Sequence, residues 1–162
     1  MSDFRLATGS EIFSRSTTYT VQSILGQGSF STIAKCTNIK GRVLDSDKSN
    51  ILQWDKAFTD RGHFCLAFEH FDKSLHDFMK EKYLESLLLR EIRPIIQQVA
   101  NALDHLKTIG MIHADLKLDN VMLVDHEHQP YKVKVIDFGL AGDVSATRLG
   151  SNIQTHPFRL RR

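Results

Sequence analysis

A short polar run in this chain contains the residue types that phosphoryl transfer from a nucleotide requires. Residues His113–Asn120 read His-Ala-Asp-Leu-Lys-Leu-Asp-Asn and place an acid, a cation and an amide on one loop. A second acid begins the run Asp137–Gly139, after two valine-rich stretches. Phosphoryl transfer uses one carboxylate to orient the accepting hydroxyl, a cation near the moving group, and an amide and a carboxylate as metal ligands.

Each polar residue of this set has an expected role. Asp115 is the candidate base or orienter of the acceptor hydroxyl, and Lys117 would offset negative charge on the phosphoryl group. Asn120 and Asp137 would hold Mg²⁺, a cation that prefers oxygen ligands. His113 is expected to pack and hydrogen-bond within the loop and not to transfer a proton. An isolated Asp or Asn is usually structural, but several such residues at fixed spacing favour the catalytic interpretation.

A long helix is predicted ahead of this loop. Apolar residues at three- and four-residue steps predict it over residues 88–107. Because Pro94 suits a first turn, its regular part is expected to begin near Arg93, and Gly110 fits the C-terminal stop. Ser74, with an acid three residues later, predicts the start of a shorter helix.

Short apolar runs predict strands on both sides of these helices. Val121–Val124 and Val133–Ile136 are expected to form a hairpin that rigidifies the polar loop, as catalysis by positioning requires. The earlier expected segments are a flexible lead-in (1–18), two strands (19–24 and 32–36) around a glycine-containing turn (25–31), a stretch without a clear pattern (37–63) and a buried strand (64–68).

The composition restricts the class of protein. The chain has 162 residues, which indicates one domain, with the charged and apolar fractions of a globular protein. A net charge of +2 gives no case for direct nucleic-acid binding or a membrane surface, and no apolar run could span a bilayer. The N-terminus lacks the order of a secretory signal. Cys36 and Cys65 lie in different strand-like runs, which indicates reduced thiols in a nuclear or cytoplasmic compartment.

From residue 25 to 158 the chain resembles a eukaryotic protein kinase, most closely the homeodomain-interacting protein kinase group. The supporting stretches are Ile92–Ala100, His113–Lys117 with Ala114 in place of the usual Arg, and Gln129–Gly139. The resemblance implies an α+β, protein-kinase-like two-lobed fold with a reduced β-rich N-lobe and an incomplete helical C-lobe. The implied divisions of residues 19–162 are an N-lobe remnant (19–68), a hinge (69–73) and a partial C-lobe (74–162).

The same resemblance implies transfer of the γ-phosphate of ATP to Ser or Thr, with Mg²⁺ and a protein substrate or partner protein. Backbone N–H groups of the glycine turn would approach the phosphates, and Ser31 stands where such loops have a third Gly. Lys48 is only a weak candidate for the phosphate-binding lysine, because neighbouring Asp45–Asp47 favour an exposed loop. The implied nucleotide-binding residues are Leu25, Gly26, Gly28, Phe30, Ser31, Ile33, Glu69 and Phe71, with Lys48 as the weak candidate.

Several departures from the kinase pattern lead us to expect weak or no activity. No run with the strand Lys can be found between Cys36 and Phe64, and no helix of adequate length to carry the pairing Glu lies between Lys48 and Phe64. Asn152 occupies the place of an activation-loop Tyr, and Leu160–Arg162 stands where Ala-Pro-Glu would anchor that segment. Ala114 removes the Arg that pairs with a phosphorylated activation loop. The substrate-binding half of the C-lobe is expected to be absent. C-lobe helices cover the apolar face of the 88–107 helix in intact kinases, so without them we expect exposed apolar surface and poor solubility.

Three other interpretations remain open. The chain could be a non-catalytic, pseudokinase-like module that binds a nucleotide or a partner, or a small-molecule phosphotransferase with a similar set of polar residues. Lys117 and the complete run Asp137–Gly139 favour the protein kinase. His126, Glu127 and His128 could form a metal site, but alternating residues at a hairpin tip more often face water.

Overall fold

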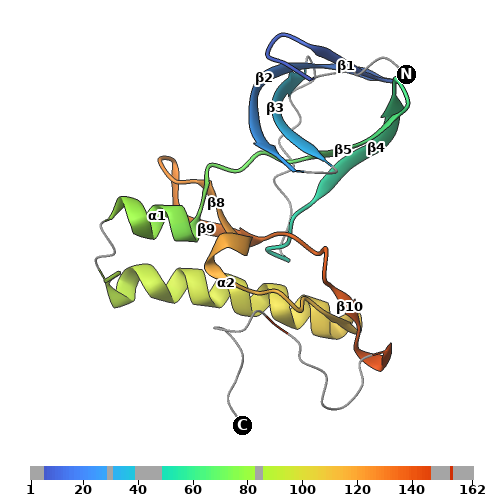
Figure 1. Ribbon diagram of the computed structural model, residues 1–162. Coiled ribbons are helices and arrows are strands. Elements are labelled where there is room, and N and C mark those ends of the chain that lie inside the picture. Colours follow the sequence, from blue (N-terminus) through green and yellow to red (C-terminus); the bar gives the residue numbers. More distant parts are fainter. Residues whose placement is uncertain (1–5, 29–30, 39–48, 83–85, 147–153, 155–162) are drawn as a thin grey trace. The chain divides into compact units, whose positions relative to one another are not determined.

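Two compact units make up the chain. The computed structural model describes residues 6–28, 31–38, 49–82, 86–146 and 154 (Figure 1). The first unit comprises residues 1–45 and 53–70, and the second comprises residues 46–52 and 71–162. The chain therefore enters the second unit briefly before it completes the first.

The first unit is built from antiparallel strands. Strands β1 (Glu11–Ser14), β2 (Thr17–Gln27) and β3 (Thr32–Asn38) form one sheet in the order β1-β2-β3. Strands β4 (Trp54–Asp60) and β5 (His63–Phe68) form a second sheet. The buried Tyr19 ring stacks on Phe58 with the ring centroids 5.7 Å apart, so aromatic packing joins the two sheets. The strands expected at 19–24, 32–36 and 64–68 are confirmed.

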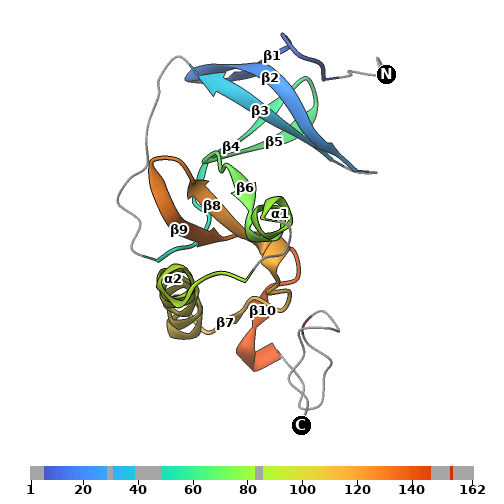
Figure 2. The same cartoon turned by 90° about the vertical axis from the view of Figure 1, so that its left-hand side faces the viewer.

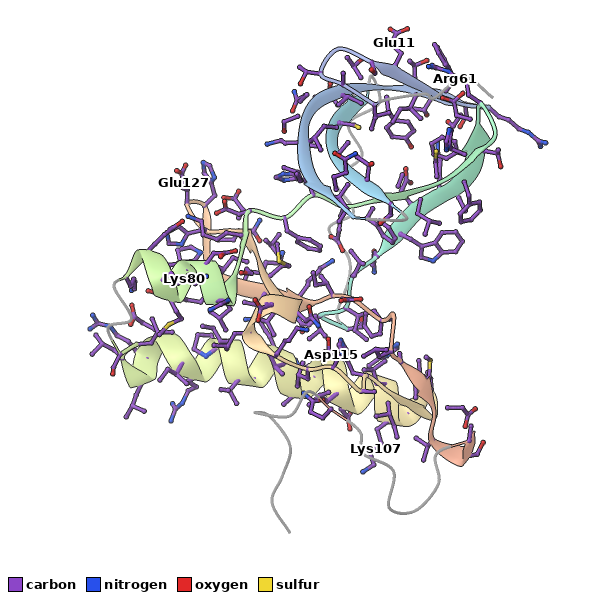
Figure 3. The ribbon with its side chains drawn as sticks, in the orientation of Figure 1. Glu11, Arg61, Lys80, Lys107, Asp115 and Glu127 are labelled. Atoms are coloured by element: carbon purple, nitrogen blue, oxygen red, sulfur yellow. The ribbon has the colours of Figure 1, made fainter. Side chains whose placement is uncertain are left out.

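The flexible lead-in expected over residues 1–18 is wrong where β1 and the start of β2 lie. The Ser14 hydroxyl accepts a hydrogen bond from the Thr17 N–H at 3.1 Å and donates one to the Thr17 carbonyl at 2.8 Å, which closes the turn between the strands. The Arg61 guanidinium lies 5.5 Å above the Phe13 ring and donates to the Glu11 carbonyl. Figure 3 shows Glu11 and Arg61 at the same end of this unit. Contacts with the β4–β5 turn thus order a segment with a weak pattern of its own.

Two further expectations for this unit need correction. The predicted turn over 25–31 begins later, because β2 continues to Gln27 and pairs Gly26 with Ile33. The strand β5 is not buried, since Phe64 is 73% exposed and Leu66 is 50% exposed. Among the described residues of this unit, only β4 pairs with β5 and no helix covers its apolar side chains.

The second unit packs two helices against a three-stranded sheet. The helices are α1 (Leu75–Glu81) and α2 (Leu89–Thr108), and the antiparallel sheet has the order β6 (Lys73–Ser74), β8 (Val121–Asp125), β9 (Gln129–Val135). A small pair joins β7 (Met111–Ile112) to β10 (Gly142–Asp143), and short 3-10 turns span η1 (Leu118–Asn120) and η2 (Val144–Ala146). Figure 2 shows the β6-β8-β9 sheet beside both helices. The predicted hairpin is confirmed.

The core of the second unit lies between the sheet and both helices. Its buried members are Leu75, Phe78, Ile95, Val121, Leu123 and Val133. Helix α1 begins as predicted, because the Ser74 side chain accepts a hydrogen bond from the Asp77 N–H at 3.0 Å. None of the helices in the described part of the chain is long and apolar enough to cross a membrane.

The span of helix α2 confirms the predicted range of 88–107 to within one residue at each end, but its regular part starts earlier than predicted. It begins at Leu89 and not near Arg93, so Pro94 lies in its second turn. The Glu91 carboxylate accepts a hydrogen bond from the Leu88 N–H at 2.7 Å and thereby supports the extra turn. Gly110 ends the helix as predicted, with φ at +74°, a conformation that favours glycine.

A short segment that precedes β4 belongs to the second unit. Ile51 forms a parallel bridge with Val135, and the Leu52 N–H donates to the Val135 carbonyl at 2.8 Å. The Asn50 amide nitrogen donates to the Val133 carbonyl and to the Gln98 side-chain oxygen, each at 3.2 Å. These contacts attach residues 50–52 to the edge of β9 and to helix α2.

Candidate active site

The polar loop predicted from the sequence follows β7 and is held to the core by His113. The His113 ring is 3% exposed, its Nε2 lies 2.9 Å from the Ile136 carbonyl oxygen, and its Nδ1 accepts from the Asp115 N–H at 3.2 Å. Because Nδ1 is an acceptor, the proton resides on Nε2, which donates to Ile136. The ring is thus a hydrogen-bonded packing residue, as expected for His113.

Asp115 is the centre of a compact polar group. Its carboxylate oxygen Oδ2 accepts from Lys117 Nζ at 2.7 Å and from Asn120 Nδ2 at 3.1 Å. Asn120 Nδ2 also donates to the Asp115 backbone carbonyl at 2.8 Å. Asp115 is 7% exposed and Asn120 5% exposed, whereas the Lys117 side chain is 27% exposed. Two donors on one oxygen fix the orientation of the carboxylate.

The Lys117 ammonium stays positively charged through the neutral pH range. Its hydrogen bond to Asp115 raises the pKa of Lys117, and the nearby charges of Asp115, Asp119 and Asp137 act in the same direction. The arrangement therefore keeps a cation next to the acid on which the proposed chemistry depends.

The second acid, Asp137, is attached to the same loop through its neighbours. The Ile136 N–H donates to the Asn120 carbonyl at 2.9 Å, and the Phe138 ring packs against His113 with centroids 4.9 Å apart. Asp137 has φ at +62°, and its Oδ1 accepts from the Gly139 N–H at 3.3 Å. Its side chain is exposed. The structure thus joins Asp115, Lys117 and Asn120 directly and connects the Asp137 turn to them by backbone contacts.

The residues predicted to hold Mg²⁺ fit that cation as a partial ligand set. The Asn120 nitrogen is committed to Asp115, so its oxygen Oδ1 is the atom it can offer to a metal, and Asp137 adds an exposed carboxylate. No group of three or more His, Cys, Asp or Glu is placed to hold a metal anywhere in the described part of the chain. Mg²⁺ commonly takes its other ligands from water and substrate phosphates. The alternative metal site at the β8–β9 tip has no support, since His128 pairs with Asp125 at 2.9 Å.

The predicted nucleotide residues Leu25, Gly26, Gly28, Ser31 and Ile33 lie on the β2–β3 hairpin of the first unit. The Gly28 N–H donates to the Ser31 carbonyl at 2.8 Å, and Leu25 and Ile33 are exposed. A Cβ atom at Gly26 would meet no described atom within 4 Å, so packing does not require glycine there.

The other residues predicted to bind the nucleotide lie outside the β2–β3 hairpin or outside the described part of the chain. The Glu69 carboxylate accepts from the Gln53 N–H at 2.9 Å in the first unit. Phe71 is the first residue of the longer segment of the second unit, and its side chain is half-buried. Residues 49–63 contain β4 and no helix, which agrees with the expected lack of a pairing helix there. Phe30, Lys48, Asn152 and Leu160–Arg162 lie outside the described residues.

Two contacts of the polar loop were missed by the sequence interpretation. His76 Nδ1 lies 2.8 Å from Asp119 Oδ1 and joins α1 to the η1 turn, which lowers the pKa of Asp119. The Gln154 side chain bonds the backbone of Leu116. No spacing pattern indicates either pair, because each joins residues that are far apart in the sequence.

A model of the protein kinase domain family matches residues 42–159. The chain belongs to the protein kinase family. Among curated relatives, homeodomain-interacting protein kinase 2 of Mesocricetus auratus is 37% identical over 186 aligned residues, covering 97% of this chain and 16% of that protein. Homeodomain-interacting protein kinase 1 of Caenorhabditis elegans is 44% identical over 115 residues, covering 71% of this chain and 14% of that protein. Homeodomain-interacting protein kinase 4 of Homo sapiens is 42% identical over 107 residues, covering 66% of this chain and 17% of that protein.

The predicted resemblance to this kinase group is thus confirmed, and the chain spans less than a fifth of the length of these relatives. The 186 aligned positions exceed the 162 residues of the chain, so the Mesocricetus auratus protein has residues with no counterpart here. A crystallised kinase domain superposes with a TM-score of 0.76 at 20% identity, covering 94% of this chain and 58% of that one. This likeness confirms the predicted kinase-like α+β fold.

Proposed function

We propose that this chain is a serine/threonine protein kinase domain that transfers the γ-phosphate of ATP slowly to protein hydroxyls. The observation that supports this most is the Asp115 carboxylate, buried and oriented by Lys117 at 2.7 Å and Asn120 at 3.1 Å. In this proposal Asp115 accepts the hydroxyl proton while the hydroxyl oxygen bonds the phosphorus and the bond to the β-phosphate oxygen breaks. Lys117 offsets charge on the transferred group.

Asn120 Oδ1 and the Asp137 carboxylate would hold Mg²⁺ in this proposal. Mg²⁺, when bound, would neutralise charge on the phosphates of ATP. The exposed hairpin residues Leu25 and Ile33, with an open backbone at Gly26, are the proposed nucleotide contacts, together with Gly28, Phe30, Ser31, Glu69 and Phe71. Without a recognised strand Lys and helix Glu, we expect a rate on the order of a thousandfold below that of a complete kinase.

The proposed division of the chain is an N-lobe remnant (19–68), a hinge (69–73) and a partial C-lobe (74–162). The change of unit between His70 and Phe71 falls inside this hinge and supports it. The unpaired, half-buried thiols of Cys36 and Cys65 support a reducing nuclear or cytoplasmic compartment. The proposed partners are protein substrates, in keeping with the family.

A transfer assay with labelled ATP, Mg²⁺ and a generic Ser/Thr protein substrate tests the proposal. Phosphate should appear slowly on the substrate with the wild-type chain and vanish with Asp115→Asn. Asp104→Asn, at an exposed position on α2, is the matched control and should leave the rate unchanged. Transfer that survives Asp115→Asn would reject the role of Asp115. Transfer to a small alcohol or sugar, and not to protein, would favour a small-molecule phosphotransferase.

A non-catalytic binding module is the second candidate. It is favoured by residues 49–63, which form strand β4 and no helix that could carry the pairing Glu. It predicts that Mg²⁺–ATP raises the melting temperature without any phosphate transfer. Asp115→Asn would then leave the thermal shift unchanged, and this pair of results would replace the catalytic proposal.

A further inference from the structure

One side chain from the far end of the chain bonds the polar loop at two points. The Gln154 Oε1 atom accepts a hydrogen bond from the Leu116 N–H at 3.0 Å, and Gln154 Nε2 donates to the Leu116 carbonyl oxygen. A primary amide that meets both polar groups of one residue reproduces the pairing of two residues in antiparallel strands. The two residues are 38 positions apart in the sequence.

These bonds fall on the two peptide groups that join Asp115 to Lys117. The Leu116 N–H belongs to the peptide group after Asp115, and the Leu116 carbonyl belongs to the peptide group before Lys117. Asn120 holds the first of these groups from its other side, through the Asp115 carbonyl at 2.8 Å. Gln154 therefore completes the support of the first peptide group and bonds the second.

The surroundings of this contact indicate that it is a defined position and not an accidental surface contact. Leu116 and Gln154 are both half-buried, and the Leu116 side chain packs against the core of the second unit. Gln154 has φ at +86°, a backbone conformation that residues other than glycine rarely adopt. Such a conformation persists where neighbouring contacts compensate for it, and the two hydrogen bonds to Leu116 are such contacts.

We propose that Gln154 is a positioning residue of the proposed phosphoryl-transfer site. Its amide fixes the peptide groups on both sides of Leu116 and so holds Asp115 and Lys117 in their paired orientation. The role rests on the proposed kinase function, but the hydrogen bonds can be tested without any activity. Catalytic contact is not part of the proposal, because Gln154 acts through the backbone of Leu116.

The first test measures amide hydrogen exchange by NMR on the ¹⁵N-labelled chain. Gln154→Ala should increase the exchange rate of the Leu116 amide about tenfold, the effect of losing one hydrogen bond. Gln97→Ala, an exposed glutamine on α2, is the matched control and should leave that rate unchanged. The Leu123 and Val133 amides report on the core. If Gln154→Ala also deprotects these core amides, Gln154 is a folding residue and the positioning role is rejected.

The second test follows the Lys117–Asp115 pair by the ¹³Cε titration of Lys117. Gln154→Ala should shift the titration midpoint down, in the direction seen when Asp115→Asn removes the partner charge. An unchanged midpoint together with unchanged Leu116 exchange would overturn the inference. If the wild type transfers phosphate, Gln154→Ala should lower kcat and leave the KM for ATP unchanged. A wild type without transfer refutes the kinase proposal, while exchange and titration still decide the role of Gln154.

Discussion

The carbonyl oxygen of Ile136 and the Nε2 atom of His113 are 2.9 Å apart, so the turn with Asp137 is bonded to the loop with Asp115. The same ring accepts from the Asp115 N–H and packs against Phe138. A single buried side chain therefore contacts both of the segments that carry the two acids of the candidate site.

Replacing this ring should loosen both acids together. We expect His113→Ala to lower the free energy of unfolding by about 1–3 kcal/mol, because a buried N–H and a partly buried carbonyl lose their partner. Urea denaturation measures this loss, and His105→Ala, at an exposed position on α2, is the control. A loss no larger than that of the control would contradict the buried role of His113.

Glu91 should make stability depend on acid pH. Hydrogen bonds from Tyr131 and from the Leu88 N–H lower the pKa of Glu91 from 4.5 to about 2. The hydrogen bond and the positive charge of Lys82 contribute to this lower pKa in the same direction. Because the folded pKa is the lower one, this stabilisation is complete above pH 4.5 and disappears as the pH falls towards 2.

Glu91→Gln tests this dependence by urea unfolding between pH 7 and about pH 3. The stability difference between wild type and variant should be largest at neutral pH and shrink on acidification. Glu127→Gln, at the exposed hairpin tip labelled in Figure 3, is the control and should give no such trend. A constant difference for Glu91→Gln across this pH range would refute the assignment.

Ala114 has φ at +65°, in the left-handed region that costs a side chain about 1–2 kcal/mol. Ala114→Gly should therefore raise the free energy of unfolding by up to about 1 kcal/mol, after the entropy of the glycine is subtracted. Ala100→Gly, on the exposed face of α2, is the same substitution in a helix and should lower it by about 1 kcal/mol. Urea unfolding measures both changes. If both variants raise, or both lower, the free energy of unfolding, the proposed strain at Ala114 is contradicted.

The outer face of α2 should limit solubility. Leu89 is 84% exposed and Ile96 is 60% exposed, and both line a surface hollow together with Ile92. The double change Leu89→Gln and Ile96→Gln should raise the ammonium sulfate concentration of precipitation and alter the unfolding free energy by about 0.5 kcal/mol or less. Ile95→Ala, one residue away but buried, should cost about 2–5 kcal/mol. Unchanged precipitation by the double variant would show that another surface controls solubility.

The sequence alone predicted the parts of the fold that depend on local spacing. Three features can each be read from a short stretch of sequence: the Ser74 cap, the apolar periodicity of α2, and the valine-rich strands β8 and β9. The loop from His113 to Asn120 was also predictable, because its polar residues bond mainly to one another.

The parts that were missed depend on distant partners. Strand β4 has a weak pattern of its own and forms through its pairing with β5, since strand preference depends strongly on context. The β1 strand depends on Arg61, and the loop contact of Gln154 joins residues 38 positions apart. The exposure of Phe64 was missed because an apolar run in a sequence does not reveal whether another element covers it.

The attachment of residues 50–52 to β9 has a consequence for the order of folding. Asn50 and Val133 are 83 residues apart in the sequence, so their contact closes a long loop and forms slowly. During synthesis, this segment leaves the ribosome long before its partner strand exists. Residues 50–52 cannot form their hydrogen bonds to β9 until β9 has been translated. The docking of this segment is therefore a late event in the biogenesis of the chain.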